Sequence, residues 1–364
     1  MTLSLPKWFD LHAHFRQGPN VASYIEDHLA MGCAGALAMP NTQPPVSRVS
    51  GERNEGAWSI ESYRDDLLSA GAEAFEELIV PLYLTGETTS RMIDEGAASG
   101  QLRACKYYPP HGTTNAEHGV PMAQWIGSDV FRAMEEHGIV LCVHGEEHGL
   151  SGSAYFDEKQ SAESLFYSET FPRVIEAHPR LKIVCEHVTT TEAVAFVGGA
   201  SDRVGATITP QHLLYTVGHL LQGLRYHLYC LPLVKFERDR EALRAAVTNP
   251  GQRKFFAGTD SAPHTAKATA FGCAAGCYTG GCAPQLYAMA FEEAGADLAG
   301  ETGLDAFTAF LCANGPAFYG FAGSDQRFEL LKKRSTTRTS TRAEGRVTPL
   351  PAGMNTDLAW TIVS

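Results

Sequence analysis

Short runs of apolar residues alternate along the chain with longer stretches in which apolar residues recur at helical spacing. This alternation predicts repeated strand and helix units around a parallel sheet. Eight of the short runs have the length of a strand, and eight is the number of strands that closes a barrel. The expected strands lie near Trp8–His12, Gly35–Met39, Leu78–Leu84, Arg103–Lys106, Ile139–His144, Lys182–His187, Val204–Ile208 and Lys254–Gly258.

The longer stretches predict helices, some of which follow an Asn, Ser or Thr suited to capping a helix N-terminus. We therefore expect an α/β fold, a (β/α)8 TIM barrel, as one domain over residues 1–364. The barrel itself should span about residues 7–320, with a C-terminal extension over about 321–364. The basic, hydroxyl-rich segment 332–346 is expected to be a solvated loop. The expected helices are Val21–Met31, Thr88–Ser99, Ser161–Ala177, Arg238–Val247, Pro284–Ala294 and Leu304–Ala313.

The charge of the chain argues against some classes of partner. Its net charge is -12, with 41 acidic and 29 basic residues, which disfavours binding to nucleic acid or to an anionic membrane surface. We therefore expect a small-molecule substrate. Met1–Asp10 lacks the pattern of a signal peptide, and no apolar run reaches the roughly 18 residues of a membrane helix. These features, with nine mostly scattered cysteines, predict a cytoplasmic protein with reduced thiols.

Candidate metal ligands lie at the ends of several expected strands. The first strand ends in Asp10-Leu11-His12-Ala13-His14, and alternation along a strand sends His12 and His14 to the same side. Barrel enzymes carry their catalytic groups at the C-terminal ends of the strands, so further ligands are expected there. Those candidates are Lys106, His144, His187 and Asp260.

These residue types favour a pair of divalent ions. Zinc accepts neutral imidazole nitrogen and carboxylate oxygen, so four histidines and Asp260 can hold two ions at the C-terminal ends of the strands. A charged Lys106 would be repelled by such ions. A neutral lysine amine can add carbon dioxide and become a carbamate with two oxygens, although the sequence by itself leaves this open.

Several short motifs surround these candidates in chain order. They are His12-Ala13-His14-Phe15-Arg16, Met39-Pro40-Asn41-Thr42, Lys106-Tyr107-Tyr108-Pro109, Val143-His144-Gly145-Glu146, Glu186-His187 and Gly258-Thr259-Asp260-Ser261-Ala262-Pro263-His264. Together they resemble the motifs of the dihydroorotases of the short, stand-alone bacterial type. The resemblance extends from about Trp8 to Tyr319.

The resemblance implies two zinc ions, a reaction and a homodimer. It places His12, His14 and Asp260 on one ion, His144 and His187 on the other, and a carboxylated Lys106 between them. It implies the reversible cyclisation of N-carbamoyl-L-aspartate to L-dihydroorotate in de novo pyrimidine biosynthesis. Asp260 is then also the catalytic residue, which takes a proton in the hydrolytic direction and returns it to the ring nitrogen.

The resemblance also suggests the substrate contacts. Arg16 can present its planar guanidinium to the substrate carboxylate, and Asn41 and His264 complete that binding site. Away from such a site, these residues could form a salt bridge, an Asx-turn or a helix cap. The remaining expected contacts are the side chains of Thr113 and Thr114 and the main chains of Leu231, Ala275 and Gly276.

Thr113 and Thr114 belong to a turn-rich segment, Pro109–Asn115, that is expected to act as a mobile lid over the substrate. The alternative is an ordinary flexible loop. The segment Thr265–Thr269 departs from the family pattern, which is usually richer in basic residues there.

Two other functions stay open. A hydantoinase or allantoinase would share the metal ligands but need not bind a carboxylate, so Arg16, Asn41 and His264 separate it from a dihydroorotase. A non-catalytic barrel of the same fold would have lost metal ligands, whereas all six positions are filled here.

Overall fold

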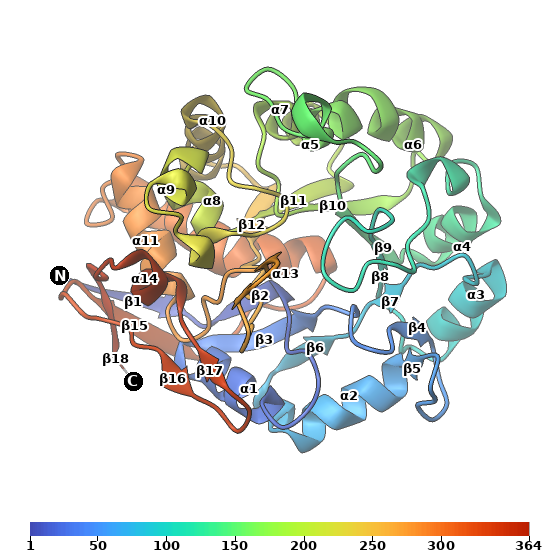
Figure 1. Cartoon of the computed structure of the whole chain (residues 1–364), viewed down its shortest axis with the longest axis horizontal. Helices are drawn as coiled ribbons and strands as arrows, with labels where there is room; N and C mark the ends of the chain where they lie inside the picture. Colours follow the sequence, from blue (N-terminus) through green and yellow to red (C-terminus); the bar gives the residue numbers. More distant parts are fainter. Residues whose placement is uncertain (364) are drawn as a thin grey trace.

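The computed structural model describes residues 1–363 and confirms the expected (β/α)8 barrel. Parallel strands lie at the centre, and helices surround them (Figure 1). Strands β2, β3 and β6 pair in one group, and β7 to β12 pair in chain order in the other. The barrel strands are β2 (Trp8–Ala13), β3 (Cys33–Ala38), β6 (Glu77–Ile79), β7 (Leu82–Tyr83), β8 (Ala104–Tyr107), β9 (Val140–His144), β10 (Lys182–Glu186), β11 (Val204–Ile208) and β12 (Phe255–Ala257).

The barrel closes between β2 and the residues that follow β12. The Asp260 amide donates to the carbonyl of His12 at 2.9 Å, and the His14 amide donates to the carbonyl of Ser261 at 2.9 Å. The same contacts that complete the sheet therefore bring candidate ligands of the first and last strands together.

The third expected strand, Leu78–Leu84, is divided into β6 and β7 at Val80-Pro81. A proline has no N–H for the strand ladder, so a regular strand does not continue through it. β6 pairs with β3 and β7 pairs with β8, so the two pieces together occupy one position in the barrel.

Apolar side chains fill the end of the barrel where the strands begin. Helix α13 (Asn314–Tyr319) contributes Phe318 and Tyr319 to this cluster. Because this end is filled by apolar groups, the polar side chains of the strands gather at the opposite, C-terminal end. The other members of the cluster include Phe9, Leu11, Leu37, Ile79, Val140, Val184 and Phe256.

The expected helices are present with shifts of a few residues at their ends. They are α1 (Val21–Ala30), α3 (Ser90–Ala98), α5 (Ala162–Leu165), α6 (Phe171–Ala177), α10 (Glu237–Thr248), α11 (Ala283–Glu293) and α12 (Glu301–Thr308). The expected helix Ser161–Ala177 contains a π-helical turn at Phe166–Thr170, and a second π turn at Ala309–Ala313 follows α12. Across residues 1–363, no helix combines the length and apolar composition that a membrane crossing requires.

Several other helices were not named in the sequence analysis. They are α2 (Ile60–Ser69), α4 (Asp129–His137), α7 (Thr191–Gly199), α8 (Pro210–Leu214), α9 (Val217–Leu221), α13 and α14 (Leu350–Met354). Two of them carry ordinary signals. Ser59 forms a capping box with Ser62 before α2, and α4 lies between a Ser128 cap and Gly138 in the left-handed region at φ 67°.

The C-terminal extension contributes strands to a small sheet, while most of residues 332–346 are exposed and lie outside regular strands, as expected for a solvated loop. Strand β15 (Arg327–Leu331) pairs with the N-terminal β1 (Thr2–Pro6) and with β18 (Thr361–Val363). Strands β16 (Ser340–Thr341) and β17 (Arg346–Val347) form a hairpin. Three basic residues of the segment have acidic partners: Lys332 pairs with Glu292, Arg334 with Asp357 and Arg342 with Asp27. Two further short strand pairs complete the described fold: β4 (Val46–Arg48) with β5 (Trp58–Ser59), and β13 (Ala268–Thr269) with β14 (Gly272–Cys273).

Candidate metal centre and substrate site

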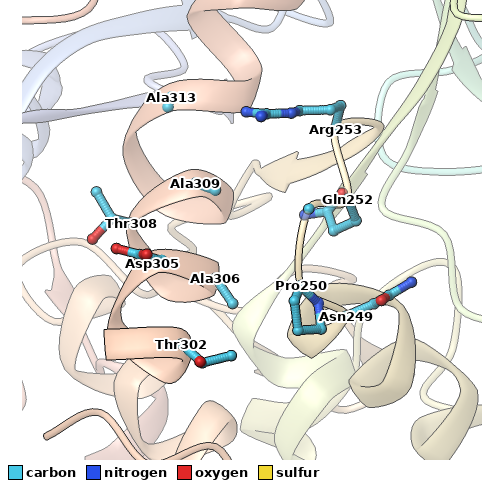
Figure 2. Close-up of a pocket in the computed structure, with 11 residues that line it drawn as sticks. Asn249, Pro250, Gln252, Arg253, Thr302, Asp305, Ala306, Thr308, Ala309 and Ala313 are labelled. Atoms are coloured by element: carbon cyan, nitrogen blue, oxygen red, sulfur yellow. The ribbon is translucent and has the colours of Figure 1, made fainter. Parts of the chain in front are cut away.

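A surface cavity of about 500 Å³ lies at the end of the barrel where the strands begin. It is lined by residues 249–253, which precede β12, and by one face of α12 and the π turn after it (Figure 2). Its ionisable lining residues are one base, Arg253, and one acid, Asp305. This cavity does not gather the groups that acid–base or metal chemistry needs, and those groups lie at the other end of the barrel.

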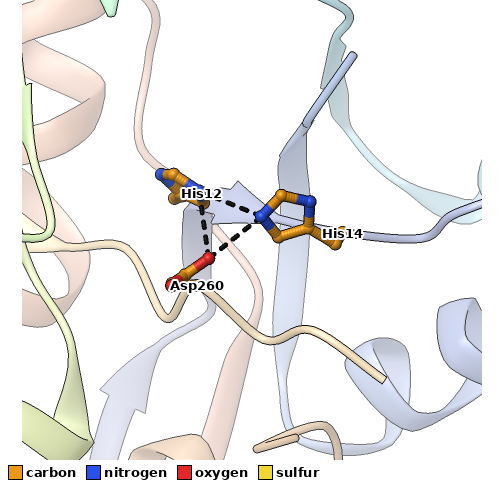
Figure 3. A group of neighbouring side chains, drawn as sticks. All are labelled: His12, His14 and Asp260. Atoms are coloured by element: carbon orange, nitrogen blue, oxygen red, sulfur yellow. Dashed lines mark hydrogen bonds and ion pairs between the residues drawn. The ribbon is translucent and has the colours of Figure 1, made fainter. Parts of the chain in front are cut away.

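Three candidate ligands converge where β2 ends (Figure 3). The Nε2 atoms of His12 and His14 are 3.4 Å apart. Oδ1 of Asp260 lies 3.0 Å from Nε2 of His14 and 3.3 Å from Nε2 of His12. All three side chains are buried. Two imidazole nitrogens and a carboxylate oxygen that face one another in this way form a donor set suited to zinc.

The other three candidates adjoin this group. The ring of His187 is 5.0 Å from the ring of His12 and 4.8 Å from the ring of His144, measured between centroids. The Nζ atom of Lys106 contacts the carboxylate of Glu186, whose other oxygen is 3.1 Å from Nδ1 of His12. The structure thus places all six expected ligands in one buried cluster.

Glu186 was missed by sequence analysis as a residue of the site. It is buried, and its carboxylate touches Lys106 and His12, which come from two other strands. It also forms a possible ligand group with His12 and His187. The sequence carries a signal for it, because an acidic residue in the apolar strand Lys182–Glu186 requires a partner when it is buried.

Asp10 is a second residue that sequence analysis left without a role. Its Oδ2 accepts from the Thr259 hydroxyl at 2.6 Å and lies 3.2 Å from Nε2 of His28. Its Oδ1 accepts from the Thr259 amide at 2.9 Å. Asp10 therefore joins β2 to the residue just before Asp260. Its position two residues before His12, on the same side of the strand, was the available signal.

Three residues of the site adopt the left-handed backbone region. The φ angles are 63° for Arg16, 42° for His187 and 49° for Asp260. Residues other than glycine rarely adopt this backbone conformation. Strained backbone of this kind concentrates at functional sites. At His187 it has a direct effect. Successive side chains of a regular strand point to opposite faces, and the left-handed backbone at His187 interrupts this alternation. The consecutive residues Glu186 and His187 therefore both reach the same cluster.

The two adjacent histidines have opposite pKa shifts. Burial lowers the pKa of His12, but the nearby carboxylates of Glu186 and Asp260 outweigh burial and raise it to about 9. Burial, with the charge of Arg16, lowers the pKa of His14 to about 4. Burial opposes ionisation of Asp260, yet its contacts with His12 and His14 hold its pKa well below the usual range. Asp260 is therefore an ionised acceptor and His14 offers a neutral nitrogen.

Lys106 has a partner that sequence analysis did not anticipate. Its Nζ contacts Glu186 and lies 4.6 Å from the centre of the Tyr108 ring. The expectation that an unmodified lysine would be repelled considered only the metal ions. In the structure, the Glu186 carboxylate occupies this side of the lysine amine.

The expected carboxylate-binding residues lie beside the metal ligands. Nη2 of Arg16 is 3.4 Å from Nε2 of His264, and that Nε2 is 2.7 Å from the carbonyl oxygen of Ala275. The side-chain amide of Asn41 donates to the carbonyl of Thr114 at 2.8 Å. Among residues 1–363, Nη1 of Arg16 and Oδ1 of Asn41 are buried and have no hydrogen-bond partner. Buried polar atoms of this kind need a ligand or water.

The expected lid and main-chain contacts lie around the same place. Thr113 and Thr114 are half-buried, and the Thr114 hydroxyl is 3.5 Å from the carbonyl of Ala275. The Gly276 amide donates to the carbonyl of Tyr229, two residues before the half-buried Leu231, at 3.0 Å. The structure therefore brings segments 113–114, 229–231 and 275–276 together near His264.

Gly276 is held by close packing. Its φ angle is 139°, and a Cβ there would lie 2.6 Å from Cβ of Ala262 and 2.9 Å from Nε2 of His264. Glycine is the residue that fits this approach of main chain to the site.

The amino-acid sequence is similar to those of known dihydroorotases over most of its length. The chain is 43% identical to a dihydroorotase of Aromatoleum aromaticum over 337 residues, which cover 91% of this chain and 90% of the relative. It is 40% identical to a dihydroorotase of Pseudomonas fluorescens over 366 residues, which cover 99% and 98% of the two chains. No family model matches the chain.

Solved structures show the same architecture. The structure of a Saccharomyces cerevisiae dihydroorotase in complex with 5-fluoroorotic acid superimposes with a TM-score of 0.83 at 27% identity. The match covers 100% of this chain and 98% of the yeast chain. The C-terminal extension, as well as the barrel, therefore falls within the shared fold.

Proposed function

The chain belongs to the dihydroorotase family, and on that basis we propose how its site interconverts N-carbamoyl-L-aspartate and L-dihydroorotate. The observation that carries the proposal is the convergence of His12, His14 and Asp260 beside an arginine with an unpartnered buried nitrogen. The first group suits metal-assisted chemistry on an amide, and the second suits a substrate with a carboxylate.

Two zinc ions fit the donor set. His12, His14 and Asp260 would hold one ion, His144 and His187 the other, and a carboxylated Lys106 would lie between them. The fit is supported by the convergence of neutral His14 with an ionised carboxylate and by the buried Nδ1 of His187, which lacks a partner within residues 1–363. Bound zinc supplies Lewis acidity, which polarises an amide carbonyl and acidifies water.

Arg16, Asn41 and His264 orient the substrate. The Arg16 guanidinium donates to the substrate α-carboxylate. This contact gives a partner to Nη1, which has none among residues 1–363. His264 is neutral, because burial and the charges of Arg16 and Lys267 lower its pKa to about 3. It therefore contributes a hydrogen bond without adding a charge. Together these contacts direct the ring amide toward Asp260.

Asp260 moves the proton. In hydrolysis, its carboxylate takes a proton from the attacking water and then gives it to the departing ring nitrogen. In cyclisation the same steps run in reverse. Its pKa is held below the usual range by His12 and His14, so the carboxylate is ionised in the resting site. Thr113 and Thr114 close over the substrate, donate hydrogen bonds and exclude water.

The test is an assay of the purified chain in both directions, together with zinc quantitation. Cyclisation of the carbamoyl-aspartate dianion consumes one proton and releases water to give the dihydroorotate monoanion. The equilibrium ratio should therefore shift about tenfold toward dihydroorotate for each unit of decrease in pH. About two zinc ions per chain are expected. Activity on an uncharged cyclic amide with none on dihydroorotate would favour a hydantoinase or allantoinase, and a metal-free, inactive protein would favour a scaffold.

A further inference from the structure

A buried lysine, Lys267, lies three residues beyond His264 and contacts three main-chain carbonyls. Its Nζ is 2.6 Å from the oxygen of Tyr229, 2.6 Å from that of Ala274 and 2.5 Å from that of Gly276. An ammonium has three N–H donors and no acceptor, so each donor can serve one carbonyl. The residue is 8% exposed. Its hydrogen bonds are thus satisfied by the main chain alone.

The charge of Lys267 is not matched by a nearby carboxylate. In the part of the chain that the structure describes, the lysines that form ion pairs are Lys106, Lys235 and Lys332. Burial of a charge without a counter-ion is costly unless something compensates it. The carbonyls of Ala274 and Gly276, which hold Lys267, flank Ala275, and Ala275 contacts His264 beside Arg16. A buried cation in this position is suited to an anionic ligand, because its charge adds to that of Arg16.

The three carbonyls belong to the two segments that carry the expected main-chain substrate contacts. Ala274 and Gly276 flank Ala275, whose carbonyl is 2.7 Å from Nε2 of His264. Tyr229 lies two residues before Leu231 and also accepts from the Gly276 amide at 3.0 Å. One side chain therefore joins segment 229–231 to segment 274–276.

We infer that Lys267 is a positioning residue for substrate binding, which fixes these two segments against each other and adds a positive charge that favours an anionic cyclic amide. The inference rests on the proposed function. The low pKa of His264, caused by burial and by the charges of Arg16 and Lys267, is consistent with this role. Because the main-chain contacts are made equally by the bound substrate and the transition state, their loss raises KM more than it lowers kcat.

The test compares Lys267→Met with Lys254→Met. Lys254 is a matched control, because its Nζ also contacts three carbonyls, at Val197 (3.2 Å), Gly198 (3.5 Å) and Ala200, at the opposite end of the barrel. For Lys267→Met, KM for L-dihydroorotate should rise about tenfold while kcat stays within about threefold. For Lys254→Met, both constants should match those of the wild type, whatever the change in melting temperature.

The outcomes separate this inference from the proposed function. If the wild-type chain does not interconvert the two substrates, the proposed function fails. If the wild type is active and Lys267→Met retains its KM, the role of Lys267 is overturned and the function stands. A fall in kcat at unchanged KM also overturns it, because that result indicates a general loss of active protein. Should Lys267→Met not fold, Lys267→Gln, which keeps amide donors but removes the charge, gives the same comparison of KM.

Discussion

The carboxylate of Glu186 lies 3.1 Å from Nδ1 of His12, on the opposite side of the ring from Asp260. If zinc is held by Nε2, the remaining ring nitrogen of His12 faces this carboxylate. Carboxylates that hold a ligating histidine in this way fix both its tautomer and its orientation. The same carboxylate also contacts Nζ of Lys106, so it lies between two of the expected ligand residues.

We expect Glu186→Gln to weaken zinc binding about 10- to 100-fold. The amide keeps the shape of the side chain but loses the negative charge that faces Nδ1 of His12. Zinc affinity is measured by competition with a chelator, followed by metal analysis. Asp239→Asn is the matched control, since Asp239 is a buried carboxylate that accepts from the Thr191 amide at 3.0 Å. Equal zinc affinity in wild type and Glu186→Gln would contradict this role.

Asp260→Asn should reduce kcat by a factor of about 10² to 10⁴, which is the usual contribution of a positioned acid or base. The amide cannot accept the proton of water, whereas His12 and His14 still offer nitrogen ligands. The variant should therefore retain part of its zinc. Steady-state kinetics and metal analysis of the same preparation test both statements. Wild-type turnover in Asp260→Asn would exclude Asp260 as the proton carrier.

Arg16→Lys should lower kcat/KM by about 10²-fold, although the charge is preserved. Lysine cannot reproduce the planar fork that binds both oxygens of a carboxylate. Arg64→Lys serves as the control, because the Arg64 guanidinium donates to the carbonyl of Leu78 at 2.6 Å, away from the site. If kcat/KM fell by the same factor in both variants, the decrease in Arg16→Lys would reflect lost stability and not lost carboxylate binding.

His264→Asn should reduce the pH dependence of stability. The folded chain has a His264 pKa of about 3, below the ordinary value of 6.5. Between these values the unfolded chain binds a proton that the folded chain does not, so stability is lost as pH falls. One such group contributes a slope of up to about 1.4 kcal/mol per pH unit. Denaturant unfolding from pH 4.5 to 7.5 should show a shallower slope for His264→Asn, and parallel curves would contradict this account.

Arg342→Ala should lower the free energy of unfolding by about 1–3 kcal/mol without changing the kinetic constants. Arg342 pairs with Asp27, which also accepts from the Tyr278 hydroxyl, and this contact ties the C-terminal hairpin to α1. Arg338 of the same segment is exposed, so Arg338→Ala should stay within about 0.5 kcal/mol of the wild type. Equal stability of the two variants would indicate that the hairpin is not held by this pair.

Much of the architecture could be predicted from the sequence. The eight apolar runs identified all eight strand positions, because strands buried on both faces need continuous apolar residues. The two-residue spacing of His12 and His14 and the positions of Lys106, His144 and His187 at strand ends predicted one site at one end of a barrel. In a parallel barrel, the C-terminal ends of all strands lie at the same end, so residues at these strand ends must lie near one another.

Other features depended on the tertiary structure. The role of Glu186 arises from the left-handed backbone at His187, which lets neighbouring residues face the same cluster. The folding of the tail depends on acidic partners such as Asp27, more than 300 residues away in the chain. The three carbonyls that surround Lys267 come from the main chain, which carries no side-chain signal. Local spacing in the sequence determined the strands and the principal ligands, whereas contacts between distant segments, which no local pattern encodes, decided what supports those ligands.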